Sequence, residues 1–321
     1  MEHSPIENIK KTLKSIREKM STFDAYFSKG LELYEKKEYT LAIKAFKLAL
    51  EQSNAQNYAN YNLALAYQQI NDADNAKKCY ELFLKEFPND QSSLYNIALI
   101  HFDYKEYDDA CKYFHESFEI KPDKLTVKAI TQSYIYAQKT DELYKFIDKI
   151  FSDLKYDKIL AYDIAKEIEE VAPKVKNRAL LDKSFEIYLK LFEIFPHNFA
   201  ILITISLEYS KKGDWDNAIL YCQKALVEEP NSFNANNQMG LIYYCCEDYK
   251  RSITYYEKAF KINSKTEPKI YSNLAYAYEK TGRYEDALKL LKDLIIKFPN
   301  YPEKDVIKKQ ARKYTEKLKK H

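Results

Sequence analysis

The sequence contains little glycine, with 4 glycines and 9 prolines among 321 residues. Four glycines are too few for the glycine-rich loops that hold phosphates, and neither GxxxxGK nor GxGxxG occurs. No run approaches the roughly 18 apolar residues of a membrane-spanning helix. The first residues also lack the apolar segment of a signal peptide. The sequence therefore predicts neither a nucleotide-binding loop nor a membrane span.

Histidine and cysteine are also scarce. The five histidines are scattered through the repeats or lie at the termini, and no two of them stand four residues apart, which is a common spacing of metal ligands. The five cysteines are an odd number and lie inside helical patterns, which indicates reduced thiols and a cytoplasmic location. We therefore predict no metal, no cofactor, no small-molecule substrate and no catalytic set, and an enzyme is the least favoured reading.

The charge is nearly balanced. Lys and Arg number 51 and Asp and Glu number 48, so the net charge is +3. A balance of this kind does not by itself indicate a nucleic-acid partner.

Residues 199–232 contain two helical patterns separated by Gly213-Asp214, and Pro230 ends the second. In the first, apolar residues recur from Ile201 to Tyr209 at the spacing of one helical face. A Gly-Asp break between two such patterns indicates a helix–turn–helix unit.

This unit recurs along most of the chain. Its small residue at Ala218 recurs at steps of 34 or 35 residues, apart from one longer step near the middle. The equivalents are Ala42, Ala76, Ala110, Ser184, Ser252 and Ala287. Exit prolines recur at Pro88, Pro122, Pro196, Pro230 and Pro299, and small residues of the first helix at Gly30, Ala64, Ala98, Ser206, Gly240 and Ala275. Several residue types share one period, which is the signature of a repeat array.

These residues resemble the tetratricopeptide repeat (TPR). The resemblance implies an all-α right-handed superhelix (an α-solenoid) of about eight helix–turn–helix repeats with a capping helix at each end. It also implies a concave groove, lined by the first helix of each repeat, that binds a peptide segment or a partner helix.

The repeats divide the chain into five parts. We expect an N-terminal capping helix at 1–22, three repeats at 23–124, two degenerate repeats at 125–198, three repeats at 199–301, and a basic C-terminal helix at 302–321. An inserted loop near 172–178 explains the longer step. The first helix is either a cap or a dimerisation helix, and the last is either a cap or a contact for nucleic acid or an anionic surface; the cap is favoured in both cases.

The resemblance also names groove-facing positions. They carry aromatic and amide side chains: Phe27, Tyr61, Asn62, Tyr95, Asn96, Phe102, Asn237, Gln238, Tyr244, Asn273 and Tyr276. A clamp for a C-terminal carboxylate is not expected, because Phe27 and Leu31 replace its Lys and Asn. Asn62, Asn96, Gln238 and Asn273 share one position, and a row of amides can bind a peptide backbone of any sequence.

The groove charges differ between the two halves. The first three repeats offer Asp24, Glu35 and Asp103, whereas the last three offer three lysines and one glutamate. We therefore expect a basic or apolar segment to bind in the N-terminal half and a more acidic segment in the C-terminal half. The predicted function is a non-enzymatic scaffold for a protein partner. The alternative is self-association into a homo-oligomer, through the N-terminal helix or an end of the array.

Overall fold

The computed structural model describes residues 22–52, 58–153 and 156–319, and these residues form helices without a strand. The predicted all-α array of paired helices is confirmed. The N-terminal capping helix expected at residues 1–22 lies, up to residue 21, outside the described residues. No helix in the described ranges is long and apolar enough to cross a membrane.

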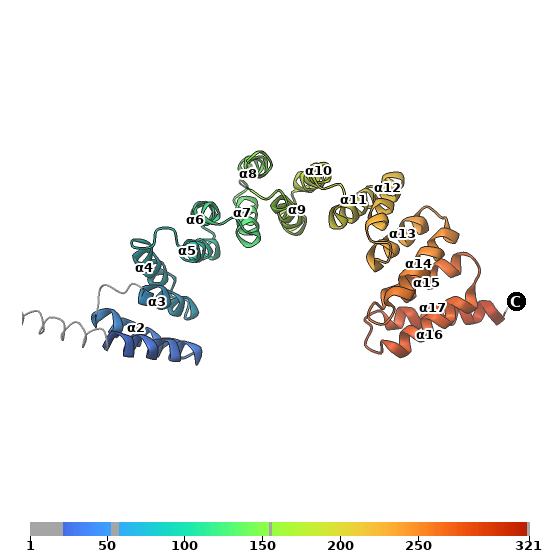
Figure 1. Cartoon of the computed structure of the whole chain (residues 1–321). Helices are drawn as coiled ribbons and strands as arrows, with labels where there is room; N and C mark the ends of the chain where they lie inside the picture. Colours follow the sequence, from blue (N-terminus) through green and yellow to red (C-terminus); the bar gives the residue numbers. More distant parts are fainter. Residues whose placement is uncertain (1–21, 53–57, 154–155, 320–321) are drawn as a thin grey trace, which may run out of the picture. The chain divides into compact units, whose positions relative to one another are not determined.

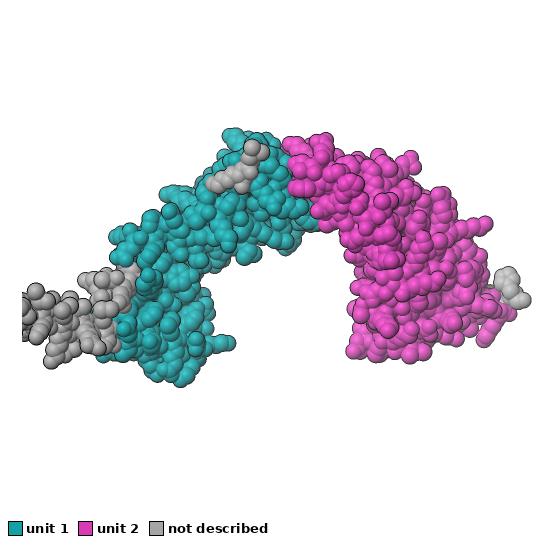
Figure 2. Space-filling model, viewed as in Figure 1, with its two compact units in different colours: residues 1–178 teal, residues 179–321 magenta. Residues whose placement is uncertain are grey.

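The chain divides into two compact units, residues 1–178 and 179–321 (Figure 2). The first unit contains a helix at residues 22–35 followed by eight labelled helices (Figure 1): α2 Tyr39–Gln52, α3 Tyr58–Gln69, α4 Ala73–Leu84, α5 Gln91–Asp103, α6 Tyr107–Ile120, α7 Lys124–Tyr136, α8 Thr140–Ser152 and α9 Leu160–Val171. The pair α7 and α8 forms despite its loss of the small residues and the exit proline.

The second unit contains the remaining helices: α10 Arg178–Ile194, α11 Phe199–Lys212, α12 Trp215–Glu228, α13 Phe233–Cys245, α14 Tyr249–Asn263, α15 Lys269–Lys280, α16 Tyr284–Lys297 and α17 Lys304–Lys319. Within the two degenerate repeats expected at 125–198, α9 precedes the turn that leads into α10. The turn between α9 and α10 spans residues 172–177, where the sequence predicted an insertion.

Small residues let the two helices of a repeat cross closely. A Cβ atom added at Gly240 would lie 2.5 Å from the Tyr256 ring, and one added at Gly30 would lie 2.4 Å from the Phe46 ring. Where serine takes this position, it also forms a bond across the pair, since Ser206 Oγ donates to the carbonyl of Ala218 at 2.8 Å. The small residue in the sequence therefore marks a contact with a large buried ring or with the backbone of the second helix.

The turn within each repeat requires a left-handed residue. Gly213 and Gly282 have φ of 76° and 77°, a conformation that costs glycine little. The corresponding position holds non-glycine residues elsewhere: Lys37, Asn71, Lys105, Gln138 and Glu247, with φ between 58° and 64°. Scarcity of glycine therefore leaves most of these turns with a strained residue.

Replacing Gly240 with alanine is expected to destabilise the second unit. Alanine favours a helix by about 1 kcal/mol over glycine, whereas overpacking a filled core costs about 1–3 kcal/mol. Overpacking should prevail because Tyr256 is only 2% exposed and its ring has little room to move. The urea midpoint can be followed by the fluorescence of Trp215, the one tryptophan, which packs beside α13. The control, Leu241→Ala on the exposed side of α13, should change stability by less than about 0.5 kcal/mol.

A second prediction concerns the stability of the first unit at mildly acidic pH. His115 lies against Phe146, and its Nε2 is 2.7 Å from the Tyr134 hydroxyl. Burial, together with the charge of Lys149, lowers the pKa of His115 to about 4. Since the unfolded imidazole has a pKa of about 6.5, the unfolded state binds more protons between these values, and stability falls as the pH drops through that window.

The measurement is the urea midpoint by circular dichroism between about pH 6.5 and pH 5. The midpoint should fall in this range, and it should fall less steeply in His115→Gln. Equal slopes for the two proteins would contradict the prediction. His197→Gln, at a side chain that is 82% exposed, is the control.

Candidate functional site

A pocket of about 410 Å³ lies on the first helices of three successive repeats in the first unit. We call it the α3–α5–α7 pocket. Its lining residues are Tyr61, Leu65, Gln91, Ser92, Tyr95, Asn96, Asp123, Leu125 and Thr126. Three of the groove residues expected from the sequence, Tyr61, Tyr95 and Asn96, therefore meet in one pocket.

The two tyrosines of the pocket are held by rings of the second helices. The ring of Tyr61 lies 5.8 Å from that of Tyr80 and 5.4 Å from that of Phe83, while the ring of Tyr95 lies 5.2 Å from that of Phe114. Burial raises the pKa of both pocket hydroxyls, and the charge of Asp123 adds to the effect at Tyr95. Both hydroxyls are therefore neutral at physiological pH and can donate a hydrogen bond.

Asn96 is fixed by a short chain of hydrogen bonds. Its Nδ2 donates to the Tyr80 hydroxyl at 3.0 Å, and that hydroxyl donates to Gln68 Oε1 at 2.5 Å. The side chain is half-buried, so its position is set before any ligand binds. Preorganisation of this kind reduces the entropy cost of binding.

Asp123 supplies the acidic group of the pocket and also caps α7. Its carboxylate accepts hydrogen bonds from the Thr126 amide at 2.9 Å and from Gln91 Nε2 at 2.6 Å. Gln91 also donates to the carbonyl of Lys121 at 3.0 Å. Beside these polar groups stands Leu125, whose side chain is 67% exposed. The pocket thus combines an apolar wall, amides and one carboxylate.

The sequence did not indicate Gln91, Asp123, Leu125 or Thr126. Gln91 begins α5, and the other three lie at the start of α7, for which the sequence predicted no groove residue. The sequence did contain one signal for Asp123, because an aspartate directly before a helix is a typical N-cap and marks where that helix begins.

The other expected residues of the first unit lie outside this pocket. Phe27 packs between Phe23 and Phe46, with ring centroids 5.6 and 5.8 Å away. Phe102 packs against Tyr107 at 5.3 Å. Asn62 Nδ2 donates to the carbonyl of Tyr58, one turn earlier in its own helix, at 3.0 Å. All three are half-buried.

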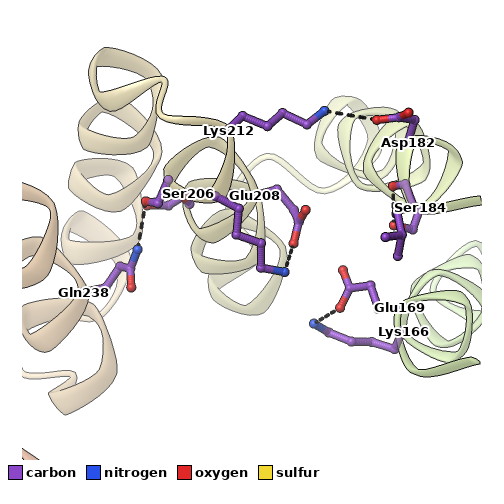
Figure 3. Close-up of polar contacts among 11 residues, drawn as sticks. Lys166, Glu169, Asp182, Ser184, Ser206, Glu208, Lys212 and Gln238 are labelled. Carbon is purple, nitrogen blue, oxygen red and sulfur yellow. Dashed lines mark hydrogen bonds and ion pairs between the residues drawn. The ribbon is translucent and has the colours of Figure 1, made fainter. Parts of the chain in front are cut away.

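In the second unit the expected amides contact neighbouring side chains. Asn273 Nδ2 donates to Asn237 Oδ1 at 3.2 Å. Gln238 is only 5% exposed, and its Nε2 donates to Ser210 Oγ at 3.0 Å (Figure 3). Of these amides, Gln238 therefore offers the least surface to a ligand.

The expected tyrosines of the second unit are half-buried. Tyr244 meets the ring of Tyr249 edge-on, with centroids 5.5 Å apart, and Lys280 lies over the same Tyr249 ring at 5.7 Å. Tyr276 stands one helical turn before Lys280 on α15.

Several groove charges in the second unit are paired internally. Lys211 forms an ion pair with Glu208, and the neighbouring Lys212 lies 3.8 Å from Asp182 (Figure 3). Glu279 Oε2 accepts from Gln310 at 2.9 Å and from the Tyr314 hydroxyl at 2.7 Å, and its Oε1 accepts from Lys313 at 2.9 Å. Helix α17 therefore lies against the end of this surface.

Burial raises the pKa of three thiols, to about 11 for Cys79 and about 12 for Cys111 and Cys222. A nucleophilic cysteine requires the opposite shift. The adjacent Cys245 and Cys246 are exposed, and burial raises the pKa of each thiol. These cysteines therefore do not provide an activated nucleophile.

Comparison with protein families identifies repeats in both parts of the chain. Two models described as tetratricopeptide repeat match residues 23–56 and 91–124, and residues 58–90, respectively. A third model, described as the tetratricopeptide repeat protein 21 C-terminal ARM domain, matches residues 196–312. The matched models describe repeat domains and not catalytic domains.

Curated relatives include proteins much longer than this chain. Tetratricopeptide repeat protein 21A of Mus musculus is 29% identical over 94 residues, which is 29% of this chain and 7% of the relative. TPR repeat-containing protein MJ1428 of Methanocaldococcus jannaschii is 24% identical over 305 residues, which is 85% of this chain and 50% of the relative. A solved MamA structure matches with a TM-score of 0.41 and 18% identity, over 56% of this chain and 93% of that one.

The contacts of Glu279 lead to a prediction about α17. Burial raises the pKa of Glu279, but the hydrogen bonds from Lys313, Tyr314 and Gln310 outweigh it, so the net pKa lies below its ordinary value. The carboxylate is therefore charged at neutral pH and accepts charge-assisted bonds. Replacing it with glutamine should weaken the attachment of α17 by about 1–2 kcal/mol.

Limited trypsin digestion measures this attachment, because α17 is rich in lysine and cleavage follows the population of the detached helix. A loss of about 1–2 kcal/mol corresponds to about 5- to 30-fold faster cleavage within residues 304–319. Glu316→Gln, on the exposed side of α17, is the control and should cleave at the parent rate.

Proposed function

Because the chain belongs to the tetratricopeptide-repeat family, we propose that it is a non-enzymatic scaffold that binds a segment of a partner protein on the first-helix face of the first unit. Such repeats generally mediate protein–protein interactions. The observation that carries the proposal is the α3–α5–α7 pocket, where Tyr61, Tyr95 and Asn96 meet on three adjacent first helices.

The lining of this pocket favours one kind of segment. Leu65 and Leu125 offer an apolar surface beside the edges of two tyrosine rings, which suits an aliphatic or aromatic side chain of the partner. Asn96 and the tyrosine hydroxyls can bind the backbone of an extended peptide. Asp123 favours a lysine or arginine next to the apolar side chain.

Exposed charges on the same face agree with this preference. Asp24, Glu35 and Asp103 are exposed in the first unit, as expected for a surface that attracts a basic segment. In the second unit, Lys211 and Glu279 are already ion-paired within the chain. We therefore place the principal binding site in the first unit. Cytoplasmic location and self-association stay predictions from the sequence.

The test is selection of peptides from a random library by the full chain, followed by fluorescence anisotropy with the enriched peptides. We expect peptides with an apolar residue near a lysine or arginine. Leu125→Glu and Asn96→Ala should each weaken binding by about ten-fold or more, as expected for residues at the centre of an interface. Both substitutions retain the buried rings, so circular dichroism should be unchanged.

The matched control lies at the corresponding first-helix surface of the second unit, where Asn273→Ala and Leu241→Glu repeat the same two changes. Loss of binding in the control pair with retention in the first pair would place the site in the second unit and contradict the proposal. Failure to enrich any peptide, with a dimeric mass by light scattering, would favour self-association.

A further inference from the structure

A histidine and two carboxylates meet at the turn between α5 and α6. We call His101, Glu106 and Asp109 the α5–α6 cluster. Their potential ligand atoms all lie within 4.8 Å of one another, and His101 Nδ1 is 2.6 Å from Glu106 Oε2. His101 is 7% exposed, whereas both carboxylates are exposed. The imidazole is thus fixed, and the two acids reach it from the solvent side.

The corresponding positions in the second unit hold a different combination. There a tyrosine replaces the histidine, and the two acidic positions hold one aspartate and one arginine. The sets are Tyr243, Asp248 and Arg251 in one repeat, and Tyr278, Arg283 and Asp286 in the next. In the first set, Arg251 Nε lies 2.7 Å from Asp248 and its guanidinium lies 4.4 Å from the Tyr243 ring centroid. A guanidinium therefore sits between the acid and the ring.

Two further repeats place an amide donor at the position of Asp109. Asn75 Nδ2 donates to Asp72 Oδ2 at 2.8 Å, and Asn217 Nδ2 donates to Asp214 Oδ2 at 2.8 Å. In each of these four repeats, the one carboxylate of the set therefore pairs with an arginine or an asparagine of the same set.

In the α5–α6 cluster, by contrast, one imidazole faces two carboxylates. Glu106 precedes α6 but makes no side-chain cap bond, and its carboxylate bonds to His101 instead. Asp109 has no hydrogen bond or ion pair to any residue in the described ranges 22–52, 58–153 and 156–319. The nearby Lys139 lies 2.6 Å from Asp108. Two carboxylates thus stand beside an imidazole where other repeats place a cation or an amide.

We propose that the α5–α6 cluster binds a divalent transition-metal cation of the Zn²⁺ type, which takes the place that the arginine occupies in the second unit. One imidazole nitrogen and two carboxylate oxygens form a ligand set that suits Zn²⁺ and leaves a position for water. On binding, the ion replaces the proton that lies between His101 Nδ1 and Glu106 Oε2; the neutral imidazole then carries its proton on Nε2, and the Nδ1 lone pair coordinates the ion.

The surroundings of His101 hold its ring in place. The ring of Tyr113 stacks on the imidazole, with centroids 5.5 Å apart and planes within 9°. Glu106 and Asp109 stand three positions apart at the start of α6, so they face the same side. The spacing of histidines and cysteines alone does not indicate this set of one histidine and two acids. The proposal replaces the prediction from the sequence that the protein binds no metal.

The experiment is isothermal titration of the full chain with ZnCl₂. It uses a parent that carries Cys245→Ser and Cys246→Ser, since two exposed thiols can bind zinc themselves. We expect one site per chain in this parent. His101→Tyr, Asp109→Asn and Asp109→Arg, which introduce residue types found at these positions in other repeats, should each weaken it by at least about ten-fold.

His197→Gln is the matched control, because His197 forms a histidine–glutamate pair with Glu228 at 2.7 Å without a third ligand. It should bind zinc as the parent does. A gain of binding is also expected when Tyr209→His and Asn217→Asp are combined, since this change reproduces the ligand set beside Asp214. A parent that does not bind zinc, or cluster variants that bind it as the parent does, would overturn the proposal.

Discussion

The close crossing of the two helices in each repeat is the constraint on which the rest of the structure depends. At Gly240 the aromatic ring of Tyr256 occupies the space that a Cβ would need, and at Ser206 the side chain bonds the backbone of the second helix. A helix pair fixed in this way holds its first helix in a set orientation relative to its second. The position of a groove side chain on that first helix therefore depends on contacts on the opposite side of the same helix.

That constraint explains how residues about 30 apart in sequence come to form one pocket. Tyr61 and Tyr95 are 34 residues apart and occupy the same place on consecutive first helices. Each ring is held by an aromatic residue of its own second helix, so neither depends on a ligand for its position. Leu125 then closes the pocket from a helix whose start is fixed by the Asp123 cap.

The sequence predicted most of the fold but only part of the site, and the physical reasons for the two outcomes differ. Small residues and prolines recur because close packing and helix ends tolerate few alternatives, so their spacing is readable. Tyr61, Tyr95 and Asn96 were predicted because the spacing fixed the register, and the resemblance to the tetratricopeptide repeat then implied which positions face the groove. The place of Gln91 in the pocket depends on its hydrogen bond to Asp123. Gln238 is buried because it packs against a neighbouring helix. Such contacts between repeats have no periodic signal.

The turn within the repeat shows how a fixed backbone can carry different chemistry. Lys105 adopts the left-handed conformation, and Glu106 N then bonds the carbonyl of His101 at 2.9 Å, so two side chains five residues apart meet. The same reversal brings Arg251 over Tyr243 in another repeat. In both cases the backbone turn brings the side chains together. The identity of those side chains determines whether the charges of the set balance one another. A repeat protein can therefore gain a site at a turn by a few substitutions, without any change in the packing that holds its helices together.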